Sequence, residues 1–131
     1  MSADYVEHER RSETRVRLRT TGGTTVTVSL PDVREARERI EGVERLRETP
    51  VRQSPTLGET VGADVWLKLE HFQKTGSFKP RGAYNKISQD VASGVSEFVA
   101  ASAGNHAQGV ALAATRCGAD STIYIDRKSV V

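Results

Sequence analysis

One lysine near the middle of the chain, Lys79, stands where a strand–loop–helix unit would present it to a ligand. Alternating apolar and polar residues predict a strand at Val65–Leu69, and a loop rich in hydroxyl and glycine residues begins at Lys74. We expect a helix over Phe78–Ser88. Ligands of open α/β folds bind at the carboxyl ends of strands. A lysine there offers a point charge to a phosphate or a nucleophilic amine to a carbonyl, and a solvated helix-start side chain is the alternative.

A second loop of small residues follows another predicted strand. Phe98–Ala101 is a short apolar run, Ser102–His106 follows it, and the helix predicted next ends near Gly118. The start of such a helix presents unpaired N–H groups and partial positive charge, which suit a carboxylate or phosphate. Gly104 permits close approach of an anion, and Asn105 can donate a hydrogen bond to an oxygen. An ordinary tight turn is the alternative.

Two titratable residues close to the second loop have simpler explanations than catalysis. His106 is suited to general-base work because imidazole titrates near neutrality, but no acidic residue is placed beside it, which favours a role in ordering the loop. Cys117 is the single cysteine and has no histidine or charge pattern around it, so we expect a packed helix residue. A lone cysteine excludes an intramolecular disulfide and fits the cytoplasm. No metal-ligand spacing is present.

The remaining sequence predicts one modest α/β domain with an extension before it. Residues 1–27 have the composition of a flexible N-terminal extension, with a weak strand at Val26–Ser29. Ser29 and Asp32 are placed to cap a helix that runs to about Val43. A short helix over Ser54–Val61, and strands that alternate with helices after it, indicate βαβ units and a parallel sheet. The net charge of +2 gives no electrostatic footprint for nucleic acid, and no run approaches the length of a membrane span.

Both loops resemble the motifs of a known enzyme family. Glu70–Ala83 and Ala101–Ala111 look like the threonine dehydratase (threonine ammonia-lyase) branch of the fold-type II pyridoxal-phosphate enzymes, and the similarity extends from about Ser29 to Ile125. Two long motifs in the right order are far more specific than either alone. The resemblance implies a partial fold of the tryptophan synthase β type, in which helices flank a parallel sheet, and pyridoxal 5′-phosphate as cofactor.

The resemblance also implies roles for single residues. Lys79 matches the lysine that forms the Schiff base with pyridoxal phosphate and later abstracts the α-proton. Phe78 matches the residue whose ring lies beside the cofactor, and Asn105 matches the asparagine that binds its 3′-oxygen. The loop that holds the substrate carboxylate matches Ser102, Gly104, Asn105 and His106. Such an enzyme converts L-threonine, and L-serine, to 2-oxobutyrate or pyruvate and ammonia; its partner is a small amino acid, and full-length relatives are homo-oligomeric.

Single positions separate the branches of this family. Threonine synthases carry Asp where Pro80 stands and Thr where His106 stands. Serine racemases place a reprotonating serine at the position of Ala103, which has no proton to give. These differences favour deamination over a racemase-like or threonine synthase-like activity. A non-catalytic binding module or remnant of the same fold is the alternative from another class.

The family's glycine-rich phosphate loop lies downstream of the matched segment. We therefore expect residues 28–131 to be the N-terminal part of the catalytic fold, truncated before that loop. Asp126–Val131 does not resemble the family's usual continuation. A chain of this extent is expected to be weakly active or inactive by itself, because the phosphate would have few contacts.

Overall fold

The computed structural model describes residues 16–19, 25–44 and 46–126, and the chain divides into two compact units, Met1–Glu38 and Arg39–Val131. In the first unit β1 (Val16–Arg19) pairs antiparallel with β2 (Thr25–Val28). The sequence predicts only the second of these strands. Most of the expected extension, residues 1–15 and 20–24, lies outside the described residues, so the predicted boundary at residue 27 stays a prediction.

Helix α1 (Leu30–Ile40) begins at the predicted cap. The backbone N–H of Ser29 donates to Asp32 Oδ2 at 2.7 Å, and the Asp32 N–H donates to the Ser29 hydroxyl oxygen at 3.4 Å, which is the reciprocal arrangement expected of a capping pair. The helix ends before Val43, because Gly42 takes a left-handed φ of 71°. Its apolar side chains Leu30 and Val33 are more than half exposed.

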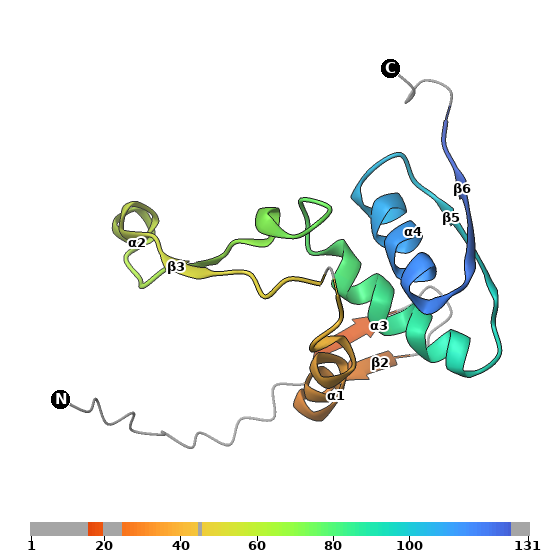
Figure 1. Ribbon diagram of the computed structural model, residues 1–131. Helices are drawn as coiled ribbons and strands as arrows, with labels where there is room; N and C mark the ends of the chain where they lie inside the picture. The colour runs from red at the N-terminus through yellow and green to blue at the C-terminus, as the bar shows by residue number, and fades with distance from the viewer. Residues whose placement is uncertain (1–15, 20–24, 45, 127–131) are drawn as a thin grey trace. The chain divides into compact units, whose positions relative to one another are not determined.

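The second unit holds the remaining elements, whose order along the chain follows the colours of Figure 1 from yellow to blue. They are β3 (Val51–Gln53), α2 (Pro55–Val61), β4 (Trp66–Lys68), a 3-10 turn η1 (Glu70–Phe72), α3 (Lys79–Ala92), β5 (Glu97–Ala101), α4 (Asn105–Cys117) and β6 (Asp120–Tyr124). The predicted α/β alternation is thereby confirmed. Helix α3 runs to Ala92 instead of Ser88, because Val91 still packs against the core.

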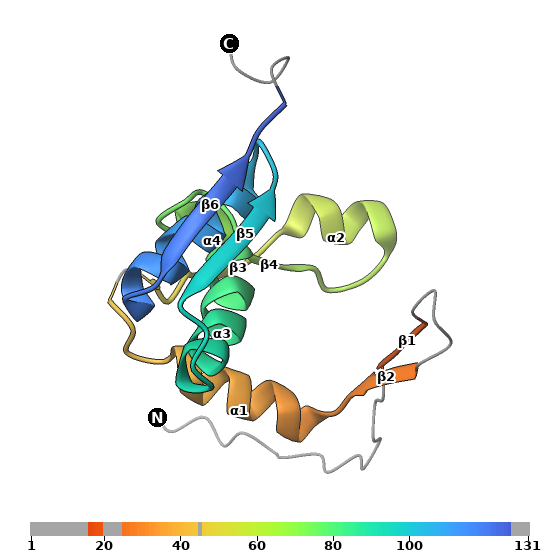
Figure 2. The ribbon, with the colours of Figure 1, turned by 90° about the vertical axis from the view of Figure 1, so that its right-hand side faces the viewer.

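Strands β5 and β6 form the one parallel pair among the described residues, and α4 is the crossover between them. Their register places Ala100 beside Ile123, and Figure 2 shows the two strands side by side and pointing the same way, with α4 behind them. The core lies between this pair and helices α3 and α4, and its most buried members are Ile87, Ala100, Val110, Ala113 and Ala114. Ala113 and Ala114 are wholly buried, so short side chains let the helix approach closely.

Strands β3 and β4 pair antiparallel, which the expectation of a single parallel sheet did not include. Val51 lies opposite Lys68, and Gln53 lies opposite Trp66. A parallel connection needs a crossover helix packed on the sheet. Helix α2 joins these strands but buries none of its side chains. It therefore does not act as a crossover helix, and the chain reverses direction between the two strands.

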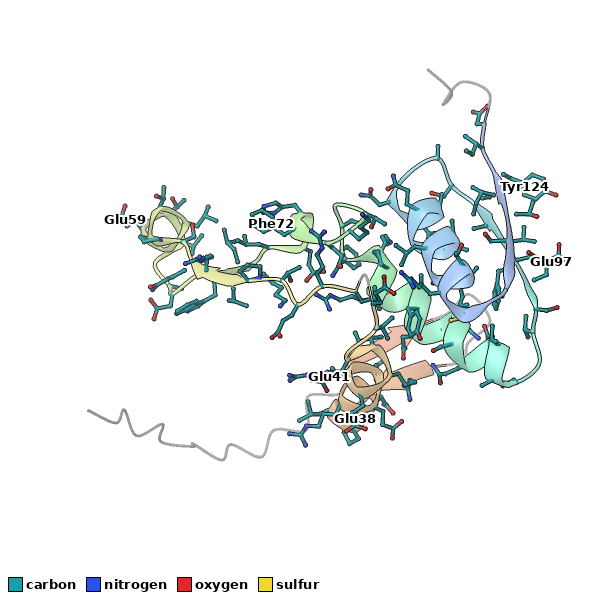
Figure 3. The ribbon with its side chains drawn as sticks, viewed as in Figure 1. Glu38, Glu41, Glu59, Phe72, Glu97 and Tyr124 are labelled. Atoms are coloured by element: carbon teal, nitrogen blue, oxygen red, sulfur yellow. The ribbon has the colours of Figure 1, made fainter. Side chains whose placement is uncertain are left out.

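The outer face of the β5–β6 pair is open. Figure 3 shows Glu97 and Tyr124 projecting on the side away from α4, and Tyr124 and Val99 are each about two-thirds exposed. Parallel sheets are normally covered on both faces. None of the described helices has the length and apolar content that a membrane crossing requires.

Candidate active site

Lys79 is the first residue of α3, and a tight turn delivers it there. Gly76 adopts a left-handed φ of 69°, and its N–H donates to the carbonyl of Gln73 at 2.8 Å. Only glycine enters this conformation without strain. Pro80 follows in the first helical turn, where its missing N–H costs nothing, and its side chain is fully buried. The helix start is therefore fixed by local sequence, while the Lys79 side chain remains exposed.

The Lys79 amine lies over an aromatic ring in an open hollow. Its Nζ is 5.1 Å from the centroid of the Phe78 ring, within reach of a cation–π contact. A hollow of about 370 Å³ is lined by Phe78, Lys79 and the small residues Gly82 and Ala83, with His106 from α4 on another side. The hollow thus offers an amine, a flat apolar surface and an imidazole together. A larger hollow of about 570 Å³ at α2 contains none of the predicted site residues.

Helices α3 and α4 touch at Gly109. A Cβ atom on Gly109 would lie 3.1 Å from the carbonyl carbon of Lys79 and 3.2 Å from its Cβ. Asn105 stands four residues earlier in α4, on the same helix face one turn back. This contact brings the two predicted loops to one place. Gly109 was not singled out from sequence, although it belongs to the second motif.

The second loop is ordered by its own hydrogen bonds. The Ser102 N–H donates to the carbonyl of Tyr124 at 3.1 Å, and the Ser102 hydroxyl accepts from the Gly104 N–H at 3.2 Å. Asn105 is exposed and opens α4. The first N–H groups of a helix have no partner within it, so this end can bind an anion. Ser102, Gly104 and Asn105 do not line the Lys79 hollow, whereas Phe78 and His106 do.

An ion pair beside the lysine loop was not anticipated from sequence. Arg81 donates from Nε to Glu70 Oε2 and from Nη2 to Glu70 Oε1, both at 2.9 Å. Thr49, only 3% exposed, donates its hydroxyl to the same carboxylate. The hydrogen bonds from Arg81 hold the pKa of Glu70 below its ordinary value, against the opposing effect of burial, with further lowering from Thr49 and Lys68.

Gln73 is the second unanticipated residue. Its side chain is 3% exposed, and its amide pairs with the backbone of Arg47: the Arg47 N–H donates to Oε1 at 2.8 Å, and Nε2 donates to the Arg47 carbonyl at 2.9 Å. Both Gln73 and Arg81 stand inside the first motif. The long sequence separation of their partners left no local signal that could have revealed the contacts.

These features define an α/β protein with an exposed lysine at the start of α3, which packs against α4 at Gly109. The sequence pattern of the family described as "Pyridoxal-phosphate dependent enzyme" matches residues 43–131, and the chain belongs to that family. The cofactor indicated is therefore pyridoxal 5′-phosphate.

Individual proteins of the family that are similar to this chain include lyases and a racemase. The L-threonine ammonia-lyase of Thermotoga maritima is 47% identical over 104 residues, which are 76% of this chain and 25% of that protein. The solved structure of a threonine deaminase from T.th. shares 41% identity with a TM-score of 0.55, covering 71% of this chain and 32% of the other. Maize serine racemase shares 39% identity with a TM-score of 0.59, covering 75% and 30%. The chain thus spans about a quarter to a third of these relatives.

The residues present fit the cofactor. Lys79 offers a primary amine, Phe78 and the glycine and alanine of α3 offer a flat apolar surface, and the α4 start offers hydrogen-bond donors for anionic oxygens. In the lysine loop, Thr75 Oγ1 is buried and has no hydrogen-bond partner among the described residues. Within the described ranges, no three acidic, histidine or cysteine side chains are grouped to hold a metal ion.

Proposed function

We propose that this chain supplies the Schiff-base lysine and the substrate-carboxylate loop of a pyridoxal 5′-phosphate enzyme that deaminates L-threonine, and L-serine, to 2-oxobutyrate or pyruvate and ammonia. The observation that carries the proposal is the contact of Gly109 with the backbone of Lys79. It packs the backbone of Lys79 against the helix whose first turn offers hydrogen-bond donors for an anion. The similarity to threonine ammonia-lyases supports the same reaction.

The residues would divide the work as follows. When bound, the cofactor withdraws electrons from the α-carbon of the substrate. The Nζ atom of Lys79 holds the cofactor and carries the proton removed from that carbon. Phe78 packs beside the cofactor ring, and the side-chain amide of Asn105 donates to its 3′-oxygen.

The substrate carboxylate would lie at the start of α4. The backbone and side-chain donors of Ser102, Gly104, Asn105 and His106 surround this helix end, where the helix dipole favours negative charge. His106 orders this loop in our proposal. A location in the cytoplasm is part of the same proposal and rests on the single cysteine.

A racemase activity is the second candidate, because maize serine racemase is among the structural relatives. Racemisation needs a proton donor on the face of the α-carbon opposite the lysine. Ala103 stands at the position expected for that donor and has no ionisable group. We therefore place deamination first.

The cofactor site is tested by trapping. The purified chain is incubated with pyridoxal phosphate, reduced with borohydride and digested, and the modified lysines are quantified by mass spectrometry. We expect modification at Lys79 well above that at Lys86, which is exposed and lines the same hollow, and its loss in Lys79→Ala without unfolding. Equal modification of all exposed lysines would contradict the proposal.

The reaction is tested in a chimera. Residues 43–126 replace the matching segment of the Thermotoga L-threonine ammonia-lyase, and 2-oxobutyrate, pyruvate and the enantiomers of serine are followed. We expect 2-oxo acid formation that Lys79→Ala abolishes. A folded chimera that interconverts L- and D-serine without releasing 2-oxo acid would establish the racemase instead.

A further inference from the structure

The residues on either side of the loop Lys74–Phe78 both donate a hydrogen bond to the same atom, the carbonyl oxygen of Arg47. Gln73 stands just before the loop Lys74–Phe78 and donates from Nε2 to the carbonyl oxygen of Arg47 at 2.9 Å. Arg81 stands in the first turn of the helix that follows and donates from Nη2 to the same oxygen, also at 2.9 Å. A segment distant in sequence therefore closes the loop that leads to Lys79.

The Gln73 anchor is buried and makes three hydrogen bonds. Besides its two bonds to Arg47, Gln73 Oε1 accepts from the Lys74 N–H at 3.2 Å, so the amide also begins the loop. At 3% exposure, this amide could not exchange its protein partners for water without opening the structure. Loss of a buried partner leaves the other unsatisfied, which costs more than the bond itself contributes.

The Arg81 anchor is oriented by a second set of contacts. Glu70 accepts both arms of the guanidinium fork at 2.9 Å, and the arginine side chain is 27% exposed against 18% for the glutamate. A bidentate pair fixes the plane of the guanidinium. That plane aims Nη2 at the Arg47 carbonyl, a geometry that the single ammonium of a lysine does not reproduce.

The loop between the anchors has little packing of its own. Lys74, Gly76 and Phe78 are exposed, and Ser77 is the one buried loop residue, with its hydroxyl accepting from the Lys79 N–H at 3.4 Å. A short exposed loop is held mainly by what fixes its ends. Lys79 follows this loop directly, so its position depends on both anchors.

We propose that Gln73 and Arg81 are positioning residues for Lys79, which act by closing the loop Lys74–Phe78 on the carbonyl oxygen of Arg47. The closure is a property of the chain without cofactor. Its consequence for chemistry rests on the proposed function, because it holds the amine that would carry the cofactor.

The test uses Gln73→Met and Arg81→Met, with Arg52→Met on the exposed strand β3 as the matched control. Amide hydrogen exchange is compared for peptides covering the loop and for peptides covering α4. We expect roughly tenfold faster exchange in the loop of both test variants, since a hydrogen bond with a charged or buried partner contributes about that factor. Exchange in α4 and in the control should stay unchanged.

A second readout follows Lys79 itself. The ratio of borohydride-trapped pyridoxal phosphate at Lys79 to that at Lys86 should fall several-fold in both test variants, a change that a uniform loss of stability would not produce. Arg81→Lys should retain the pair with Glu70 but not restore loop exchange or the trapping ratio.

Three results would overturn the inference. They are unchanged loop exchange in the test variants, equal acceleration in the loop and in α4, and full restoration by Arg81→Lys. Absence of selective trapping at Lys79 in the unaltered chain would contradict the proposed function instead, and the exchange measurement would still decide whether the loop is closed by these anchors.

Discussion

Gly109 in α4 lies directly against the backbone of Lys79 in α3. The space on that side of the helix is so narrow that a single methyl group would meet three atoms of Lys79 at 3.1 to 3.2 Å. This contact sets the spacing of the two helices that carry the candidate site.

Gly109→Ala should therefore destabilise the chain. Overpacking costs about 1–3 kcal/mol, which exceeds the roughly 1 kcal/mol that alanine gains over glycine in a helix. Urea unfolding followed by circular dichroism measures the difference. Gly82→Ala in α3 is the matched control, because a methyl group there meets nothing within 4 Å, and it should be neutral or stabilising. Equal stability of the two variants would contradict the close contact.

Acid should weaken the structure through Glu70. The hydrogen bonds from Arg81 lower the pKa of this carboxyl from its ordinary value of 4.5. The stability that Glu70 contributes is then complete above about pH 4.5, the unfolded-state value, and is lost as the pH falls through the lower folded-state pKa. The difference in urea midpoint between the unaltered chain and Glu70→Gln should shrink over that window. A difference that stays constant with pH would show that the carboxylate is not paired in solution.

Cys117 should be a slow thiol. Burial raises the pKa of Cys117, and a hydrogen bond from Tyr84 offsets part of that rise. Alkylation by iodoacetamide at pH 8 should be slower than for glutathione, because the thiolate is the nucleophile. Tyr84→Phe should slow it further by removing the hydrogen bond. The urea-unfolded chain is the control, and faster alkylation in Tyr84→Phe would mean that the variant opens the core instead.

The core formed by α3, α4 and the β5–β6 pair should depend on Ile87, which is 4% exposed. Ile87→Ala removes buried methyl groups and leaves a cavity, which costs about 2–5 kcal/mol. Thermal unfolding compares it with Val61→Ala, since Val61 is 62% exposed and should change little. Similar losses for both would mean that this core does not determine stability.

The sequence alone was sufficient for features set by neighbouring residues. The Ser29–Asp32 cap, the glycine that ends α4, and the helix start at Lys79 all follow from the conformations that single residues favour. The family was evident for a related reason, because its motifs are continuous stretches of chain. The predicted site residues could likewise be named in advance, and their roles remain predictions.

Contacts across the fold were decided only by the tertiary structure. Arg81 donates a hydrogen bond to the carbonyl of Arg47, 34 residues earlier in the chain, and Arg116 pairs with Glu44, 72 residues earlier. No helical or strand periodicity predicts contacts at such separations. The antiparallel pairing of β3 with β4 is another tertiary feature. The short helix α2 between them does not pack on the strands, so the chain turns back and β4 runs opposite to β3. Types and spacings of residues determine which groups are available. Which of them meet depends on how the backbone packs, and that is why Gln73, Arg81 and Gly109 became visible as parts of the site only in three dimensions.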